Sequence, residues 1–568
     1  MTERRNNVNL LGRGGNPEFW SDTVRNKDAY KVYRETQLKN WERLCLNEDI
    51  ESLKYSEFRI YAINGNRTIF QKPYYMRRVQ VETAAILALI YPEEQKYLDY
   101  CMDMIYAICN EYSWCIPAHL PNLMTVCNKT HLDLFACETA YTLAQIYALL
   151  GDRLDPLIKN RILFEVDRHV FSSFLKHNTW GWEVHNTANW AAVCAGSVGC
   201  SFMLLRPEQF YEIKPRIDGA MGRYLSGFKD DGFCLEGTHY WHYGFGFFIA
   251  YAEMLRDFSG GEYDYFKLEK VHSIATFIQK MYLSGKASVS FADAGGSLEY
   301  HIGMLHFLAK EYDDVKVFSP EYSYINDNCG RFCWLITAAT WLDEELYFNP
   351  SPNNAVAEYY AKESEWLVKR TESYGFAGKA GNNNEPHNHN DVGSFIIAKD
   401  GRHMVTDPGS GAYSQQYFAK NTRYEMVECS SLGHCAPYFG DLVQKYGGEY
   451  SATPSTYENG VFSFDMAGAY GDETVKSIKR SFSFTDTTVT LTDTFDYTGD
   501  APITDRIVAK VMPVISEGKV VIDTLTVTYD PGVCTVNTAE AVTSRGVTIY
   551  FADFVLKSGQ NSITLVFE

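Results

Sequence analysis

Apolar residues recur at helical spacing through about the first 345 residues of the chain. One helical face is formed at positions i, i+3, i+4 and i+7 by Leu143, Ile146, Tyr147 and Leu150. A second apolar run, residues 83–91, predicts a buried helix that Pro92 ends, because proline has no amide hydrogen to continue it. A third helix over residues 247–258 stops at the glycine pair 260–261. Many such helices predict a bundle, solenoid or toroid over residues 1–348.

Near residue 350 the spacing changes from that of helices to that of strands. Residues 394–398 and 402–406 flank Asp400 and Gly401, which is typical of a β-hairpin. Alternating or β-branched stretches follow at 481–495, 520–529 and 562–567. Turn-forming residues cluster at 349–354 and indicate a linker. We therefore expect a multidomain α+β protein in which residues 349–568 form an antiparallel β-sandwich.

The composition fits this division and narrows the class of partner. A chain of 568 residues exceeds what one hydrophobic core usually supports, so two large domains are expected. The formal net charge of −19 disfavours nucleic acid and anionic membranes as partners. Aromatic residues make up 15% of the chain, a share that suits stacking against sugars or bases but also occurs in ordinary cores. An acidic substrate requires a local basic pocket.

Cysteine usage and the N-terminus bear on the compartment. The fourteen cysteines are scattered rather than arranged as a disulfide framework, which indicates buried free thiols. No apolar run of signal-peptide length follows the N-terminus, and the longest apolar stretch, 84–91, is too short to span a bilayer. The expectation is a cytoplasmic protein, or a secreted or periplasmic one if a leader was removed.

The most distinctive motif of the β half is Glu-Pro-His-Asn-His-Asn-Asp at 385–391. His387 and His389 are two residues apart, so on an extended segment they point the same way. Asp407 and His434 follow within 50 residues, and imidazole and carboxylate are normal zinc ligands. These residues therefore predict a zinc site, although histidines in a surface loop explain the spacing equally well.

The same string permits a second interpretation. His387, His389 and Asp391 match the start of the His-x-His-x-Asp-His motif of metallo-β-lactamase-like hydrolases. Val392 occupies the place of the final histidine, and the long helical half does not suit that fold. This alternative is therefore disfavoured.

Two loops of the helical half carry candidate chemistry. Residues 180–190 and 230–243 mix Trp and Tyr with Asn, His and Glu just before predicted helices. Such loops line the concave face of a helical toroid, where sugars stack on aromatic rings. The alternative is that these aromatic residues are ordinary core at helix ends.

The motifs described above also follow a characteristic order along the chain. Asn-Trp, Asp-Gly-x3-Glu-Gly-x2-Tyr, His-x-His-x-Asp, Asp-Pro-Gly and Ser-Ser-x-Gly-His follow one another along the chain. This order resembles the heparinase II/III superfamily of polysaccharide lyases, including oligoalginate lyases, from about residue 80 to the end. The resemblance implies an incomplete (α/α) toroid, an antiparallel β-sandwich and an active site in the cleft between them.

The resemblance also implies roles for individual residues. Asn189 would neutralise the substrate carboxylate, Tyr240 would act as acid and, in a syn elimination, as base, and His387 would be a base or carboxylate contact. Tyr424 falls where some members carry a second tyrosine. One structural zinc per chain would be held by His389, Asp407 and His434. Cys435 follows His434 where the family often has Asn, so Cys435 or Cys429 can distort that site.

Further residues are candidates for binding the substrate. They are His185, Asn186, Glu236, His239, Tyr243, Arg77, Arg78 and Arg423. The reaction that the resemblance implies is β-elimination at C4 of a uronic acid in an acidic polysaccharide or oligosaccharide, which needs a carboxylate neutraliser, a base and an acid. The alternatives are a catalytically silent glycan-binding protein on the same scaffold and a toroid glycoside hydrolase.

Overall fold

A computed structural model describes residues 7–46, 50–121, 130–185, 187–351 and 356–568. Its internal contacts divide the chain into two compact units. The helical unit comprises Met1–Gly227, His242–His272 and Glu299–Ser351, and the sheet unit comprises Phe228–Trp241, Ser273–Leu298 and Pro352–Glu568. Two short segments of the predicted helical half thus group with the strands, and both carry residues discussed below.

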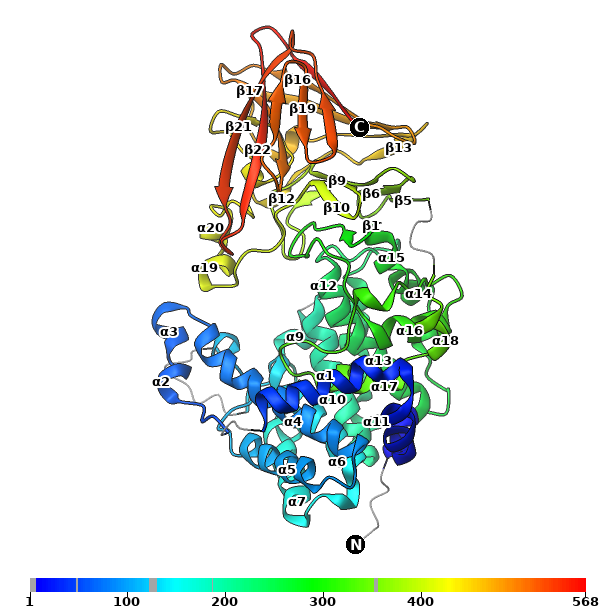
Figure 1. The fold of residues 1–568 in the computed structure, drawn as a ribbon. Coiled ribbons are helices and arrows are strands. Elements are labelled where there is room, and N and C mark those ends of the chain that lie inside the picture. The colour runs from blue at the N-terminus through cyan, green and yellow to red at the C-terminus, as the bar shows by residue number, and fades with distance from the viewer. Residues whose placement is uncertain (1–6, 47–49, 122–129, 186, 352–355) are drawn as a thin grey trace. The chain divides into compact units, whose positions relative to one another are not determined.

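The helical unit is built from helices of very different length (Figure 1). The longer ones are α1 (Lys31–Leu44), α4 (Thr68–Ile90), α5 (Gln95–Cys109), α6 (Leu134–Leu150), α7 (Pro156–Val166), α10 (Asn189–Leu205), α11 (Pro207–Ser226), α13 (Gly246–Phe258), α16 (Ile302–Glu311) and α17 (Phe332–Thr340). Short helices include α2 (Tyr55–Phe58), α9 (Gly181–Val184) and α18 (Glu344–Phe348). The apolar run 83–91 is the end of α4, and the glycine pair follows α13 as the sequence predicts. In the part of the chain that the structure describes, no helix is both long and apolar enough to cross a membrane.

Helix α10 packs against α6, α11 and α13 in the middle of the helical unit. Its small residues allow this close packing. A Cβ atom on Gly196 would lie 3.0 Å from the carbonyl oxygen of Phe247, and one on Gly199 would lie 2.7 Å from the ring of Tyr251. Both contacts are with α13. The Ala, Gly, Ser and Cys content of α10 is thus a requirement of helix packing.

The sheet unit contains antiparallel sheets of five, four and eight strands. The five-stranded sheet has the order β10 (Arg402–Val405), β9 (Phe395–Lys399), β7 (Gly375–Lys379), β6 (Trp366–Arg370) and β5 (Ala357–Ala361). The four-stranded sheet has the order β11 (Tyr438–Phe439), β17 (Ile503–Ala509), β22 (Thr548–Leu556) and β21 (Cys534–Val542). The eight-stranded sheet has the order β13 (Thr456–Glu458), β14 (Val461–Asp465), β15 (Val475–Phe484), β16 (Val489–Tyr497), β23 (Ser562–Phe567), β20 (Leu525–Thr528), β19 (Lys519–Ile522) and β18 (Val514–Ser516).

The local chemistry of turns explains where these strands begin and end. Asp400 and Gly401 both have positive φ, 53° and 75°, so β9 and β10 form the predicted tight hairpin. The alternating stretch 481–495 belongs to two strands, because Thr485 Oγ1 accepts the backbone N–H of Thr488 at 3.0 Å and closes a turn between β15 and β16. The stretch 520–529 is likewise a hairpin of β19 and β20 that turns at Asp523, whose φ is 55°.

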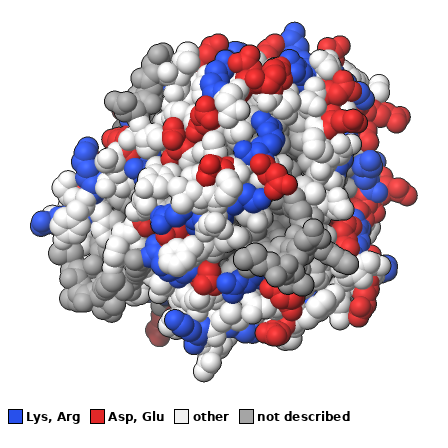
Figure 2. Space-filling model, turned by 90° about the horizontal axis from the view of Figure 1, so that it is seen from below, with Lys and Arg blue, Asp and Glu red and all other residues white. Residues whose placement is uncertain are grey.

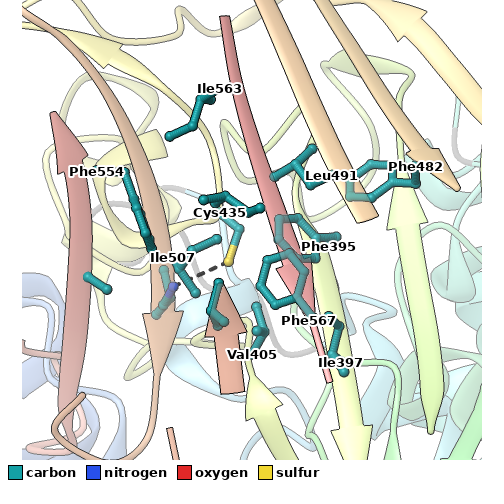
Figure 3. Packing of buried hydrophobic residues seen from close by; sticks show 14 of the residues in the cluster. Phe395, Ile397, Val405, Cys435, Phe482, Leu491, Ile507, Phe554, Ile563 and Phe567 are labelled. Carbon is teal, nitrogen blue, oxygen red and sulfur yellow. Dashed lines mark hydrogen bonds between the residues drawn. The ribbon is translucent and has the colours of Figure 1, made fainter. Parts of the chain in front are cut away.

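Side chains from all three sheets meet in one hydrophobic core (Figure 3). The ring of Phe395 from β9 lies 5.1 Å from that of Phe482 on β15 and 5.6 Å from that of Phe567 on β23. Ile507 and Phe554 add the four-stranded sheet to the same cluster. The core thus joins the predicted hairpin to the eight-stranded sheet.

One buried arginine connects this core to the loops that carry the candidate site. Arg480 is fully buried and pairs with Asp493 at 2.6 Å and with Asp505 at 2.9 Å. Its guanidinium also donates to the carbonyl oxygens of Gly393 at 2.7 Å and of Cys435 at 2.6 Å. These two residues lie next to the His-x-His-x-Asp segment and to His434. The sheet therefore fixes the backbone on which the predicted metal ligands sit.

Candidate functional site

Asp293 is the centre of a buried hydrogen-bond cluster in the sheet unit. It lies in the segment that follows β2 (Ala287–Ser288), and only 3% of it is exposed. Its carboxylate accepts from His387 Nδ1 at 2.6 Å, His389 Nε2 at 3.2 Å, Arg423 at 3.2 Å, the Tyr413 hydroxyl at 3.2 Å and the Tyr417 hydroxyl. Burial by itself raises the pKa of this carboxyl, but the hydrogen bonds and charges of the two histidines lower it well below its usual range. Asp293 is therefore an ionised acceptor that orients five side chains.

Tyr240 lies beside this cluster, at the end of α12 (Thr238–Tyr240). Its ring stacks on the imidazole of His387 with centroids 4.1 Å apart, and its hydroxyl lies 2.7 Å from that of Tyr413. The Tyr413 proton is used in the bond to Asp293, so in this arrangement Tyr240 donates to the Tyr413 oxygen. A chain of hydrogen bonds thus runs from Tyr240 through Tyr413 to Asp293.

The glycine before α12 brings Tyr240 to this position. Gly237 has a φ of 96°, and a Cβ atom on it would lie 2.7 Å from Cβ of Ala294, the residue after Asp293. Only glycine tolerates both this conformation and this approach. The Glu-Gly-x-x-Tyr motif is therefore a turn shaped to lie against the loop of Asp293.

The electrostatic setting keeps Tyr240 protonated. Burial, with the nearby Tyr413 and Asp293, raises the pKa of its phenol well above its ordinary value of about 10. Tyr240 is therefore a proton donor at neutral pH. Glu236 lies on the other side of His387, with its Oε2 atom 3.7 Å from His387 Nε2, and burial raises the pKa of that carboxyl.

The loop that carries His387 is held from both ends. His387 has a φ of 56°, which is unusual for a residue with a side chain and common at functional sites. Arg423 donates to the carbonyl oxygens of His387 and Asn388, each at 3.0 Å. At the other end, the buried Lys379 pairs with Asp391 at 2.8 Å. The loop thus holds His387 Nδ1 on Asp293 and leaves its Nε2 atom toward Glu236.

Next to this cluster, His389, Asp407 and His434 form a fully buried group whose ligand atoms lie within 4.8 Å of one another. His434 Nε2 lies 3.1 Å from the carbonyl oxygen of Glu428, to which only a protonated nitrogen can bond, so the lone pair is on Nδ1. That atom lies 2.8 Å from an oxygen of Asp407. His389 likewise has its Nε2 atom on Asp293, which leaves Nδ1, an atom without a hydrogen-bond partner among the described residues, as its possible metal ligand. Two imidazole nitrogens and a carboxylate oxygen that converge in this way suit a bound cation, which would displace the proton from His389, and they are a normal zinc set.

The two cysteines near this group differ in their surroundings. Cys435 is buried in the hydrophobic core, where its sulfur accepts the N–H of Val508 at 3.3 Å (Figure 3). Cys429 lies close to His389. Burial lowers the pKa of that imidazole, but Cys429 and Asp293 raise it to about 10. Cys435 therefore serves packing, and Cys429 is the cysteine that influences the group.

Several predicted site residues lie in the helical unit and interact there. Asn189 is the first residue of α10 and only 5% of it is exposed. Tyr243 donates to Glu138, which also pairs with Arg331 at 3.1 Å. Arg77 and Arg78 both pair with Glu111, at 3.0 and 2.7 Å, so their charges are already compensated inside the unit.

The remaining candidates are spread over both units. His185 is exposed after α9, and Asn186 lies outside the described residues. His239 is exposed beside Tyr240, with ring centroids 5.8 Å apart. Tyr424 follows α20 (Lys420–Arg423) and stacks on Tyr446 at 4.6 Å. The tyrosine that meets Tyr240 is Tyr413.

The structure thus brings together Tyr240, Glu236, His387 and Arg423 from the predicted set. Sequence reasoning missed Asp293, Tyr413 and Tyr417. The one local signal for Asp293 is an acidic residue in a run of small residues, Ala-Asp-Ala-Gly-Gly, which suits a close approach of backbones. Tyr413 precedes α19 (Gln415–Phe418) and Tyr417 lies within it, and both follow the Asp-Pro-Gly motif.

Comparison with known proteins gives similarity of fold. No family model and no curated protein match the chain. The structure is similar to a mutant of heparan sulfate lyase HepC from Pedobacter heparinus, with a TM-score of 0.62 and 13% identity over 98% of this chain and 87% of that one. It is similar to heparinase III, with a TM-score of 0.64 and 12% identity over 98% and 84%. It is also similar to the chondroitin AC lyase of Streptomyces coelicolor, with a TM-score of 0.53 and 12% identity over 95% and 82%. The helical and sheet-rich parts of this chain together have the fold of these polysaccharide lyases.

Proposed function

We propose that the protein is a polysaccharide lyase that cleaves uronic-acid-containing glycans by β-elimination. The observation that carries the proposal is the cluster of Tyr240, His387 and Tyr413 around the ionised Asp293. A merely structural cluster does not need a phenol stacked on an imidazole that has one nitrogen on Asp293 and the other facing Glu236. The similar structures named above include lyases of heparan sulfate and chondroitin, which supports an acidic polysaccharide as substrate.

In the proposed reaction each residue has one task. The His387 Nδ1–H is held by Asp293, so the Nε2 lone pair is available to take the proton from C5. The electron pair of that C–H bond forms the C4=C5 double bond, and the C4–O bond breaks. Tyr240, protonated in the resting site, gives its proton to the departing C4 oxygen. Asn189 is proposed to donate amide hydrogen bonds to the substrate carboxylate, which stabilises the charge that develops there.

We propose a structural zinc ion at His389, Asp407 and His434, one per chain. The support is the convergence of the three possible ligand atoms described above. When bound, the zinc would brace the loop of His387 electrostatically and mechanically, and it takes no part in the proton transfers. For the folds of the two units we propose the finer forms that the resemblance implies, an incomplete (α/α) toroid and a β-sandwich.

The test is a panel of uronate polymers and oligomers incubated with the full chain. Elimination creates a double bond conjugated to the carboxylate, so the product absorbs in the ultraviolet where the substrate does not. Product formation on at least one uronate substrate is expected. Cleavage that yields only saturated ends would instead identify a glycoside hydrolase, and saturable binding without any cleavage would identify a glycan-binding protein.

A further inference from the structure

The helical unit contains a cavity of about 560 Å³ whose lining includes none of the residues assigned above to catalysis. Its walls come from α1, α4, α17, α18 and the segment 320–328. Cavities of about 300–1,000 Å³ are typical of small-molecule sites. The size therefore suits a ligand of one or two sugar rings.

The floor of the cavity contains a buried carboxyl group. Glu82 lines the cavity and is 2% exposed. One of its oxygens accepts from the side-chain amide of Asn326, and the other, Oε2, has no hydrogen-bond partner among the described residues. Gln37, also 2% exposed, lines the same cavity from α1. The cavity thus offers a carboxyl and two amides, the groups that pair with hydroxyls in both directions.

The charges around the cavity select among ligands. The lining has one basic residue, Arg43, and three acidic ones, Glu82, Glu321 and Asp327. Burial raises the pKa of Glu82 well above its usual range and Asp327 already pairs with Arg331, so Arg43 and Glu321, of opposite sign, are the charges left in the lining. Neither an anionic nor a cationic ligand would therefore find a net opposite charge there, and burying an uncompensated charge is costly. A neutral ligand remains, and Tyr33 and Tyr347 add aromatic side chains to the lining, a residue type that packs well against the C–H groups of sugars.

We propose that this cavity binds a neutral saccharide of one or two rings, whose hydroxyls pair with Glu82, Gln37 and Asn326. This goes beyond the proposed lyase activity and does not rest on it. Its lining has no net positive charge to offset a carboxylate, which an enzyme acting on uronates must provide at its active site. It would therefore take a neutral sugar and exclude the acidic substrate.

The experiment measures binding to the full chain by titration calorimetry. The probes are neutral hexoses, N-acetylhexosamines and their disaccharides, with glucose and glucuronate as a pair that differs only in the carboxylate. We expect saturable binding of at least one neutral sugar, and at least tenfold weaker binding of glucuronate than of glucose. Absence of saturable binding for the whole neutral panel would overturn the proposal, as would equal affinity for glucose and glucuronate.

Variants then locate the binding. Val32 lies at the cavity and is 56% exposed, so Val32→Trp should obstruct it and weaken binding at least tenfold without disturbing the core. The matched control is Lys31→Trp, an exposed position on the same helix that is not part of the lining and lies about 100° around the helix from Val32, which should change affinity less than twofold. Glu82→Leu should also abolish binding. If Glu82→Leu does not fold, Val32→Trp still tests the proposal. Unchanged affinity in Val32→Trp would overturn the assignment to this cavity.

Discussion

At the scale of single residues, the hydroxyl of Tyr240 is the group on which the proposed chemistry depends most. Tyr240→Phe removes only that oxygen, since the ring stacked on His387 remains. A lost general acid typically costs about 10²–10⁴ in rate, so we expect kcat on a uronate oligomer to fall by that factor. The measurement is the initial rate of unsaturated product formation.

A control for this variant is Tyr446→Phe. Tyr446 donates to Asn384 at 2.9 Å on the exposed surface, so the loss of its hydroxyl should leave kcat within about twofold of wild type. If Tyr240→Phe retains more than a tenth of the wild-type kcat, Tyr240 is not the proton donor.

Glu253 gives a pH prediction at the same scale. Burial is the largest of the causes that raise the pKa of its carboxyl to about 8, although it accepts the Trp341 indole N–H at 2.7 Å. Between the unfolded pKa of about 4.3 and this folded value, the folded state holds a proton that the unfolded state has lost. Stability therefore falls as pH rises through that window.

Glu253→Gln keeps an acceptor for Trp341 and removes the titration. Relative to wild type, the variant should gain roughly 1 kcal/mol or more in the free energy of unfolding between pH 5 and pH 8. Urea unfolding at both pH values measures this difference. If the free energy of unfolding changes with pH in the variant as it does in wild type, Glu253 does not titrate in this way.

At the scale of elements, the packing of α10 against α13 depends on glycines that a helix does not otherwise favour. Gly199→Ala would place a Cβ atom 2.7 Å from the ring of Tyr251. Overpacking of this kind typically costs about 1–3 kcal/mol, and we expect the free energy of unfolding to fall by that amount. Urea denaturation monitored by circular dichroism is the measurement.

Helix α11 contains the matched control. A Cβ atom on Gly222 would have no neighbour within 4 Å. Gly222→Ala should therefore stabilise the protein by about 0.5–1 kcal/mol, because alanine loses less backbone entropy in a helix. Equal effects at the two positions would mean that helix propensity, rather than close packing, explains the glycines of α10.

The loop of His387 is the element that the proposed zinc would hold. Purified protein should contain one zinc per chain, and a strong chelator should lower both Tm and activity, since metal binding to a preformed set stabilises the folded state. His389→Ala should have the same effect without chelator. Elemental analysis and thermal unfolding measure these outcomes, and a metal-free protein with wild-type Tm would rule the site out.

At the scale of the whole molecule, the charge of −19 opposes a polyanionic substrate. On the face drawn in Figure 2, acidic and basic side chains are interspersed among the described residues, without a broad basic area. The substrate must then be recognised by a few residues close to it. Added salt screens the general repulsion between protein and substrate over a Debye length of about 8–10 Å. We expect kcat/KM for a short uronate oligomer to change little, or to rise, between low and moderate salt.

The measurement is kcat/KM on one defined oligomer at several ionic strengths. A steep dependence, with a tenfold fall by physiological salt, would require an extended basic groove and would contradict this view. A neutral oligosaccharide of the same length is the control, because its kcat/KM should not respond to screening.

Local patterns determined much of the architecture. Helical spacing and strand alternation are properties of neighbouring residues, so the change from helices to mainly strands near residue 350 and the β9–β10 hairpin are visible in the sequence. The His-x-His-x-Asp segment is equally local. Its two histidines do fall close to Asp293, and His389 does join Asp407 and His434.

Only the tertiary structure decided what surrounds those motifs. Asp293 is 94 residues from His387, and Tyr413 is 173 residues from Tyr240, so no spacing rule connects them. Segments 228–241 and 273–298 look like parts of the helical half, yet their contacts place them with the sheets. Sequence periodicity shows which face of an element is buried, but not which distant segment covers it. Long-range packing determines which segment covers that face. Here it places Asp293, which local patterns mark only weakly, at the centre of the candidate site.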